Sequence, residues 1–145
     1  MIKFLSIFLV LFLISCTTSR KTVRINCHLN ITSFNIRIPK YHDFKILKAD
    51  AESGVEYIYW YDDSAAFYIS TFKGGSSLNY ANIRNLKGAY AKRSISDSIK
   101  LNGIDFNGKY WREQKYNNIY IGYVNVKAKD YFRFDNSFNT IKFQK

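Results

Sequence analysis

Apolar and polar residues alternate along most of this chain from Val23 onward, and the apolar positions are rich in Tyr, Phe, Ile and Val. Alternation places successive side chains on opposite faces of a strand, so the pattern predicts half-buried β-strands. The expected strands are residues 23–27, 33–38, 44–49, 55–61, 65–72, 94–101, 109–116 and 119–127.

Turn-forming residues separate several of these segments. Residues 62–64 have the sequence Asp-Asp-Ser, and these side chains bond to their own nearby backbone in turns. Asn-Gly and Asn-Asn pairs tolerate the positive φ of tight hairpin turns. Such pairs are Asn102-Gly103, Asn107-Gly108 and Asn117-Asn118. We therefore expect a hairpin of the fourth and fifth strands and an antiparallel meander in the second half.

Two segments have helical spacing instead. Ile83, Leu86 and Tyr90 recur every three or four residues after a possible serine N-cap, which predicts a helix over residues 77–92, although Gly88 weakens it. Tyr131 and Phe134 share a helical face with Phe138, which predicts a second helix over residues 128–138. The expected fold class is α+β, with a single curved antiparallel sheet of about six to eight strands packed by two helices.

The first sixteen residues have the composition of an export signal. Lys3 precedes an apolar run over residues 4–14, which only a serine interrupts. The run is shorter than the roughly 20 residues that span hydrocarbon. Its end, Leu13-Ile14-Ser15-Cys16, resembles the lipobox of bacterial lipoproteins, in which the cysteine is acylated and becomes the first mature residue. The alternative is a secretory signal without lipid, but no Ala-x-Ala site surrounds Ser15.

The lipobox resemblance implies a signal peptide over residues 1–15, lipid attachment at Cys16, a tether over 16–22 and a single domain over 23–145. About 130 residues then remain, which is one domain's length of chain. Three acyl chains, as the resemblance implies, hold a protein stably on a membrane. Thr17 rather than Asp follows the cysteine. By similarity to known sorting patterns, this is compatible with the outer membrane, facing the periplasm.

The formal net charge is +11, and only Lys3 of the basic residues lies in the leader. A strongly basic domain on a membrane favours anionic neighbours such as lipid head groups, lipopolysaccharide, acidic glycans or an acidic protein. The alternative is a solvated lysine-rich surface that keeps the domain soluble. An exported, acylated chain does not ordinarily meet nucleic acid, so we expect no such partner.

Candidate catalytic groups are few. With Cys16 acylated, Cys27 has no partner within the chain, and its place in an alternating strand predicts burial. An intermolecular or reactive thiol is the alternative. Cys27 and His28 point to opposite faces of a strand, so only His42, with an acidic neighbour, offers a base for this thiol. No nucleophile, metal or phosphate motif surrounds them, so we expect no enzyme, cofactor or metal.

Aromatic residues are the remaining chemical resource, with 12 Tyr, 12 Phe and 2 Trp in the chain. Alternation places Tyr57, Tyr59 and Tyr61 on one face of a strand, and the apolar face with Ile58 is the better candidate for the core. The tyrosine stripe is either covered by a helix or offered to a partner. A second mixed stretch, with the same two readings, contains Tyr110, Trp111, Arg112 and Tyr116.

The order of elements resembles the PsbP-like fold. The resemblance rests on residues 34–39 with their proline, the middle hairpin, the helix with the meander, and the segment Phe134-Asp135-Asn136-Ser137-Phe138, and it would cover residues 33–143. Members of that family mostly bind other proteins or act as envelope accessories, which the resemblance implies here. Fold-level similarity alone does not fix a function.

Three functions follow, in order of preference. The first is a non-enzymatic, lipid-anchored envelope protein that binds a protein partner, in an immunity-type or accessory role, with Tyr57, Tyr59, Tyr61, Tyr110, Trp111 and Arg112 as candidate contacts. The second is a module for envelope glycan or lipid, in which Tyr and Trp stack on sugar while Lys and Arg meet anionic groups. The third is a hydrolase, for which no acid, base or nucleophile stands out.

Overall fold

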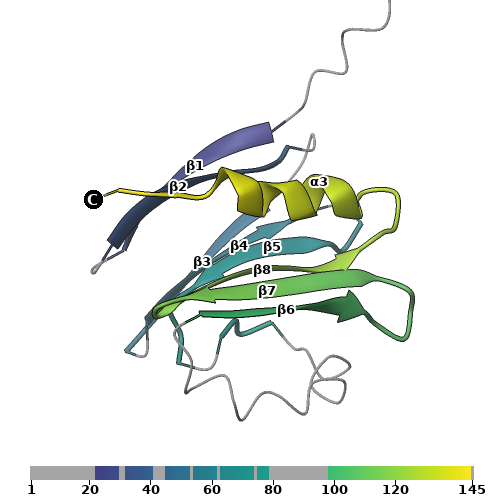
Figure 1. Cartoon of the computed structure of the whole chain (residues 1–145). Helices are drawn as coiled ribbons and strands as arrows, with labels where there is room; N and C mark the ends of the chain where they lie inside the picture. The colour runs from purple at the N-terminus through teal and green to yellow at the C-terminus, as the bar shows by residue number, and fades with distance from the viewer. Residues whose placement is uncertain are drawn as a thin grey trace, which may run out of the picture.

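The computed structural model describes residues 22–29, 32–40, 45–52, 54–61, 63–73, 75–78 and 98–144. Over these residues the protein is mostly β, with 61% strand and 11% helix. Figure 1 shows two antiparallel sheets in layers, with a short helix beside the smaller sheet. Layers of this kind bury their apolar faces against one another.

The larger sheet consists of two meanders joined by one central pairing. Its strands are β3 (Lys45–Ala51), β4 (Gly54–Trp60), β5 (Ala66–Ser70), β6 (Ser98–Ile104), β7 (Tyr110–Tyr116) and β8 (Ile119–Val126). Strands β3 to β5 pair in chain order, as do β6 to β8. Because β5 also pairs with β8, the order across the sheet is β3-β4-β5-β8-β7-β6.

The smaller sheet is a hairpin with a short third strand. It contains β1 (Thr22–Leu29), β2 (Thr32–Pro39) and β9 (Lys142–Phe143), in the order β1-β2-β9. Phe34, Ile36 and Ile38 alternate along β2 and are buried, whereas Arg37 between them is exposed. One face of the hairpin therefore points toward the larger sheet, as period-two alternation requires.

A helical segment lies beside this hairpin. Helix α3 (Tyr131–Asp135) continues into the 3₁₀ helix η2 (Asn136–Thr140). Phe134 and Phe138 are buried, and the Arg37 N–H donates a 2.8 Å hydrogen bond to Thr140 Oγ1, which attaches η2 to β2. The hairpin and the helical segment together form the layer above the larger sheet in Figure 1.

The main core fills the space between these layers. Phe134 meets Tyr61 and Tyr123 of the larger sheet edge-on, with ring centroids 5.0 and 5.7 Å apart. Edge-to-face packing of this kind is favourable between aromatic rings. The buried members of the core are Cys27, Phe34, Ile36, Ile38, Tyr59, Tyr61, Ala65, Phe67, Ile69, Ile119, Ile121, Tyr123, Val126, Phe134 and Phe138.

A second, smaller core lies on the opposite face of the larger sheet. Its buried members are Ile58, Ala66, Tyr68, Trp111, Tyr120 and Val124. Trp111 packs over Gly103 of the neighbouring strand, where an added Cβ would approach the indole to 2.9 Å. The middle of the larger sheet is thus buried on both faces.

The expected α+β class with a single curved sheet of about six to eight strands and two helices is wrong. The eight long strands overlap the expected ones, but they divide between two sheets. Alternation reveals which face of a strand is buried and not which strand pairs with it, so it could not show that β1 and β2 form a separate layer.

The two expected helices fare differently. The helix expected over residues 77–92 lies almost wholly outside the described residues. The one over residues 128–138 is a five-residue α-helix followed by 3₁₀ structure. Asn and Ser, which fill much of η2, compete with helical hydrogen bonds through their side chains. Thr140 Oγ1 accordingly donates to the Ser137 carbonyl at 2.7 Å.

Three turn predictions are confirmed and one is wrong. β4 and β5 form the expected hairpin, closed by a 2.9 Å bond from the Tyr61 N–H to the Ala65 carbonyl. Gly108 and Asn117 have positive φ in the turns on either side of β7. Gly103, however, lies inside β6, where its missing side chain leaves room for the indole instead of permitting a turn.

Candidate functional site

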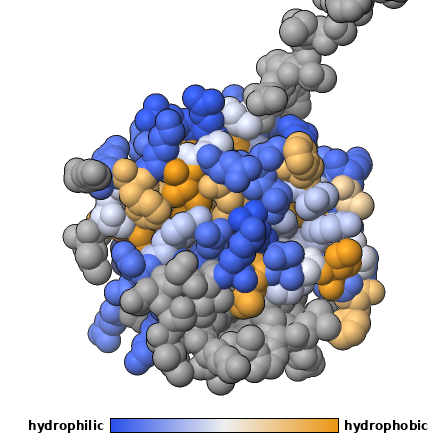
Figure 2. Space-filling model, in the orientation of Figure 1, coloured by the Kyte–Doolittle hydropathy of each residue, from blue (hydrophilic) through white to orange (hydrophobic). Residues whose placement is uncertain are grey.

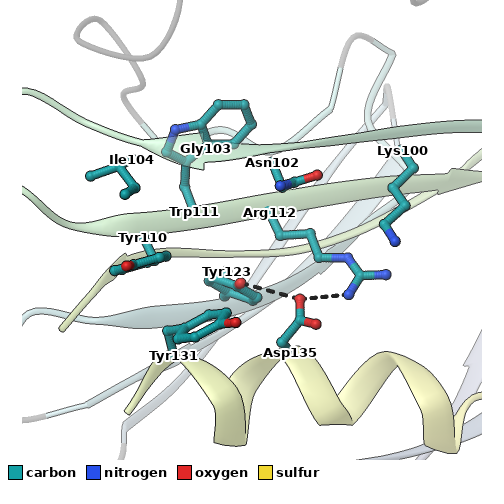
Figure 3. A pocket seen from close by; sticks show the side chains of 10 residues that line it. All are labelled: Lys100, Asn102, Gly103, Ile104, Tyr110, Trp111, Arg112, Tyr123, Tyr131 and Asp135. Carbon is teal, nitrogen blue, oxygen red and sulfur yellow. Dashed lines mark hydrogen bonds and ion pairs between the residues drawn. The ribbon is translucent and has the colours of Figure 1, made fainter. Parts of the chain in front are cut away.

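A cleft of about 420 Å³ opens between β6, β7 and the start of α3, on the face of the larger sheet that the helix covers (Figure 3). Its lining comes from β6 and β7, with Tyr123 from β8 and Tyr131 and Asp135 from α3. Small-molecule and side-chain pockets commonly fall in this size range. The cleft is therefore large enough to receive part of a ligand or partner.

Arg112 forms the floor of the cleft, and its side chain is only 7% exposed. Its Nη1 lies 2.6 Å from Asp135 Oδ1, its Nη2 donates to Gln114 Oε1 at 3.0 Å, and the guanidinium lies over the Phe138 ring at 3.9 Å. A buried charge is tolerated only with such an ion pair and hydrogen bonds. The Nε atom of Arg112 is buried without a hydrogen-bond partner.

Three tyrosines form the aromatic side of the cleft. Tyr110 stacks on Tyr131, with ring centroids 4.5 Å apart and an interplanar angle of 20°. The Tyr123 hydroxyl donates to Asp135 Oδ1 at 3.4 Å, as Figure 3 shows. Burial, and then the neighbouring Asp135 carboxylate, raise the pKa of Tyr123 above its usual value. Tyr123 is therefore a neutral hydrogen-bond donor at physiological pH.

Two polar side chains of β6 complete the cleft. Asn102 lies directly opposite Arg112 in the strand register. Lys100, two residues earlier in β6, lies on the same face of the sheet. Both side chains are exposed. Within the described part of the chain, Lys100 forms no ion pair with a carboxylate. Its ammonium group is therefore available to a ligand.

Exposed apolar side chains surround the cleft at one end of the molecule. Ile104 and Tyr131 line it and are 51% and 37% exposed, and Phe106 and Phe132, which closely follow them in the chain, are 73% and 64% exposed. In Figure 1 the β6–β7 turn and the start of α3 share the right-hand end, and Figure 2 shows apolar surface there beside hydrophilic surface. We call these four residues the apolar rim.

The structure separates the residues that the sequence singled out. Tyr59 and Tyr61 are buried in the main core, and Tyr57 packs against it. The Tyr61 hydroxyl donates to the Pro39 carbonyl at 3.0 Å. The tyrosine stripe is therefore covered, by the β1–β2 hairpin and the helical segment, and is not a surface for a partner.

The second stretch divides between two faces. Tyr110 and Arg112 lie in the cleft, whereas the Trp111 ring belongs to the second core and only borders the cleft at Gly103. Sequence reasoning did not select Asp135 and Tyr131 as site residues. A usable signal was Asp135 directly after the apolar Phe134 in a segment with helical spacing, because a carboxylate next to the core is a natural ion-pair partner for a buried cation.

Cys16, the expected site of lipid attachment, lies outside the described residues, as does His42. Cys27 is buried and is a free thiol, and burial raises its pKa to about 12. Of the two readings of Cys27, a buried thiol or a reactive one, the structure supports the buried thiol. An inaccessible neutral thiol is neither a nucleophile nor a disulfide partner. His28 is exposed and hydrogen-bonds Ser33 Oγ at 3.1 Å.

Two buried glutamates on the opposite face of the larger sheet escaped the sequence analysis. Glu56 is fully buried and accepts hydrogen bonds from the N–H and hydroxyl of Ser77. Glu113 accepts one from the Tyr68 hydroxyl. These bonds satisfy the carboxylates within the protein, so their role is structural.

Two further features bear on cofactors and membranes. No cluster of three or more His, Cys, Asp or Glu side chains with metal-binding geometry occurs in the described ranges between residues 22 and 144. None of the helices in those ranges is both long and apolar enough for a bilayer crossing.

Comparisons with known proteins identify no relative. No family model matches the chain, and neither a curated protein nor a solved structure is significantly similar to it. The similarity to the PsbP-like fold and to the lipobox stays a prediction from sequence. The function must therefore be argued from the cleft and its rim.

Proposed function

We propose that this chain is a non-enzymatic lipoprotein of the cell envelope that binds a protein partner through the cleft and its apolar rim. The acyl chains at Cys16 hold it at the outer membrane, facing the periplasm. The partner role is of an immunity or accessory type.

The apolar rim is the observation that carries the binding proposal. Among the described residues, the rim supplies four of the seven large hydrophobic side chains that are exposed. They come from two segments far apart in the sequence, which the stacked pair Tyr110–Tyr131 brings together. Apolar side chains concentrated beside a polar cleft are typical of protein interaction sites, because burying them against a partner removes their contact with water.

Replacing rim residues tests this role. The double variant Phe106→Ser, Phe132→Ser should abolish capture of a stoichiometric protein from solubilised envelope by the tagged protein. Both side chains are exposed, so folding should be unaffected. The matched control is Ile46→Ser, Leu47→Ser on the edge strand β3, where both side chains are also exposed. Equal capture by both double variants contradicts the proposed site.

The anchor has its own test. Cys16→Ser should move the protein from the membrane fraction to the soluble fraction and abolish incorporation of labelled palmitate. Cys27→Ala is the matched control, since its thiol is buried and carries no lipid in the proposal. Membrane retention of the Cys16→Ser variant contradicts lipid anchoring at this residue.

One observation favours a second candidate, a module for envelope glycan. Sugar rings stack on aromatic faces, and their hydroxyls bond amides and carboxylates. Tyr110 and Tyr131 offer such faces beside Asn102 and Asp135. Saturable binding of a purified envelope glycan, with loss on Tyr131→Ala, supports this candidate over the first.

A further inference from the structure

We propose that the cleft is an anion-binding subsite, in which Lys100 and Arg112 receive a carboxylate from an acidic, partly apolar peptide segment of the partner. This inference rests on the proposed function and specifies what enters the site. It follows from three features: the cations, the remaining donors of Arg112, and the apolar rim.

The cations of the cleft outnumber its carboxylates. Lys100, Arg112 and Asp135 are its charged lining residues, which leaves a net positive charge. Arg112 and Asp135 pair with each other at 2.6 Å, and Lys100 has no partner among the described residues. Figure 3 shows the Lys100 side chain directed toward the guanidinium group. An anion near both cations completes the balance of charge.

Arg112 keeps hydrogen-bonding capacity for such an anion. A guanidinium has five N–H donors. The hydrogen bonds to Asp135 and Gln114 use one donor on each terminal nitrogen, which leaves the second donor of each, whereas Nε is itself buried. The side chain is also fixed, because it lies over Phe138. A fixed, partly desolvated guanidinium recognises a carboxylate with little loss of conformational entropy.

The apolar rim distinguishes a peptide from a sugar acid. Ile104 lines the cleft, Phe106 and Phe132 are close in the chain to its lining residues Ile104 and Tyr131, and all three are more than half exposed. A sugar can cover an aromatic face, but an isoleucine and two separate phenylalanines are best covered by apolar side chains. The occupant that matches both features carries acidic residues interspersed with apolar ones.

The test uses a fluorescein-labelled peptide of sequence Glu-Phe-Glu-Leu-Glu-Phe and a matched peptide with Gln in place of each Glu. Binding to the full chain is measured by fluorescence anisotropy at low salt. Lys100→Gln should weaken binding of the acidic peptide by about fivefold, in the range for a partly exposed charge pair. Lys48→Gln, on the exposed edge strand β3, should leave it unchanged.

Three results overturn the inference. The first is equal binding of the glutamine peptide, and the second is an equal effect of Lys100→Gln and Lys48→Gln, which would show unspecific attraction to a basic protein. The third is Lys100-dependent binding of polygalacturonate fragments without binding of the acidic peptide, which would assign the cleft to glycan.

The outcome is separable from that of the proposed function. If the double variant Phe106→Ser, Phe132→Ser loses its protein partner while peptide binding does not depend on Lys100, the proposed function stands and the anion subsite fails. If that double variant keeps its partner while binding of the acidic peptide still depends on Lys100, the anion subsite stands and the proposed docking surface fails.

Discussion

Gly122 is the residue at which the second core is most tightly constrained. An added Cβ would lie 2.1 Å from the Tyr68 hydroxyl oxygen and 2.6 Å from the Arg112 carbonyl oxygen. Tyr68 is buried and donates to Glu113 from directly above this glycine. The Tyr68 side chain can lie across β8 toward Glu113 only because Gly122 has no side chain at this position.

We predict that Gly122→Ala lowers the free energy of unfolding by about 2–4 kcal/mol, since the methyl group displaces Tyr68 and disturbs its bond to the buried carboxylate. Urea denaturation measures the loss. Gly108→Ala is the comparison, because its surroundings are open and only its φ of 70° is unfavourable. This second variant should lose about 1 kcal/mol. A loss for Gly122→Ala no larger than for Gly108→Ala contradicts the steric account.

Individual residues show where sequence reasoning reached its limit. Cys27 occupies an apolar position of the alternating pattern, which predicted its burial. This prediction is confirmed. Burial of Arg112 did not follow from its neighbours in β7, because it depends on Asp135 and Phe138, which approach from a different segment. A charged residue can be buried when the tertiary structure brings ion-pair and hydrogen-bond partners to it. A single sequence does not show which residues those partners are.

At the scale of elements, the alternating pattern located the strands well. Each of β1 to β8 overlaps an expected strand, and the β4–β5 hairpin with its Asp-Ser turn is confirmed. The pattern works because a strand with one buried face repeats every two residues. It failed at Gly103, where a glycine inside a strand and a glycine in a turn have the same sequence neighbours.

The alternating pattern did not show how the strands are grouped into sheets. Two separate sheets and a single sheet require the same alternation within each strand, so the hairpin of β1 and β2 was not distinguishable as its own layer. The short α3 was overestimated for a related reason. Phe134 and Phe138 have helical spacing, but a 3₁₀ turn after Asp135 brings both to the core as well.

At the scale of the molecule, the abundance of aromatic residues is explained by two cores. The sequence offered the tyrosine stripe and residues 110–112 as candidate aromatic surface for a partner. The larger sheet instead buries aromatic side chains on both faces, with Tyr59, Tyr61 and Tyr123 on one and Tyr68 and Tyr120 on the other. Among the described aromatic residues that stay exposed, Phe106, Tyr131 and Phe132 belong to the rim that we propose for the partner, and Phe143 lies outside it.

The same burial makes the whole molecule sensitive to alkaline pH. Burial raises the pKa of the Cys27 thiol to about 12 from 9.0, and also raises the pKa values of Tyr59, Tyr116 and Tyr123 from 10.0. In the unfolded chain these groups ionise near their ordinary values, whereas in the folded protein they stay neutral. Their contribution to stability is therefore complete below about pH 9 and is lost as the pH rises toward the folded values.

We predict that the urea midpoint of unfolding changes little between pH 7 and pH 9 on account of these groups and falls steadily from about pH 9 to pH 11. Cys27→Ala removes the first group to ionise, so it should delay the fall until tyrosine ionises in the unfolded chain. The part of the tyrosinate absorbance that belongs to Tyr59, Tyr116 and Tyr123 should appear together with unfolding and not before it. Tyrosinate absorbance that is as large in the folded protein as in the urea-unfolded chain at the same pH would show that these three hydroxyls are accessible to water, which contradicts the closed core between the two sheets.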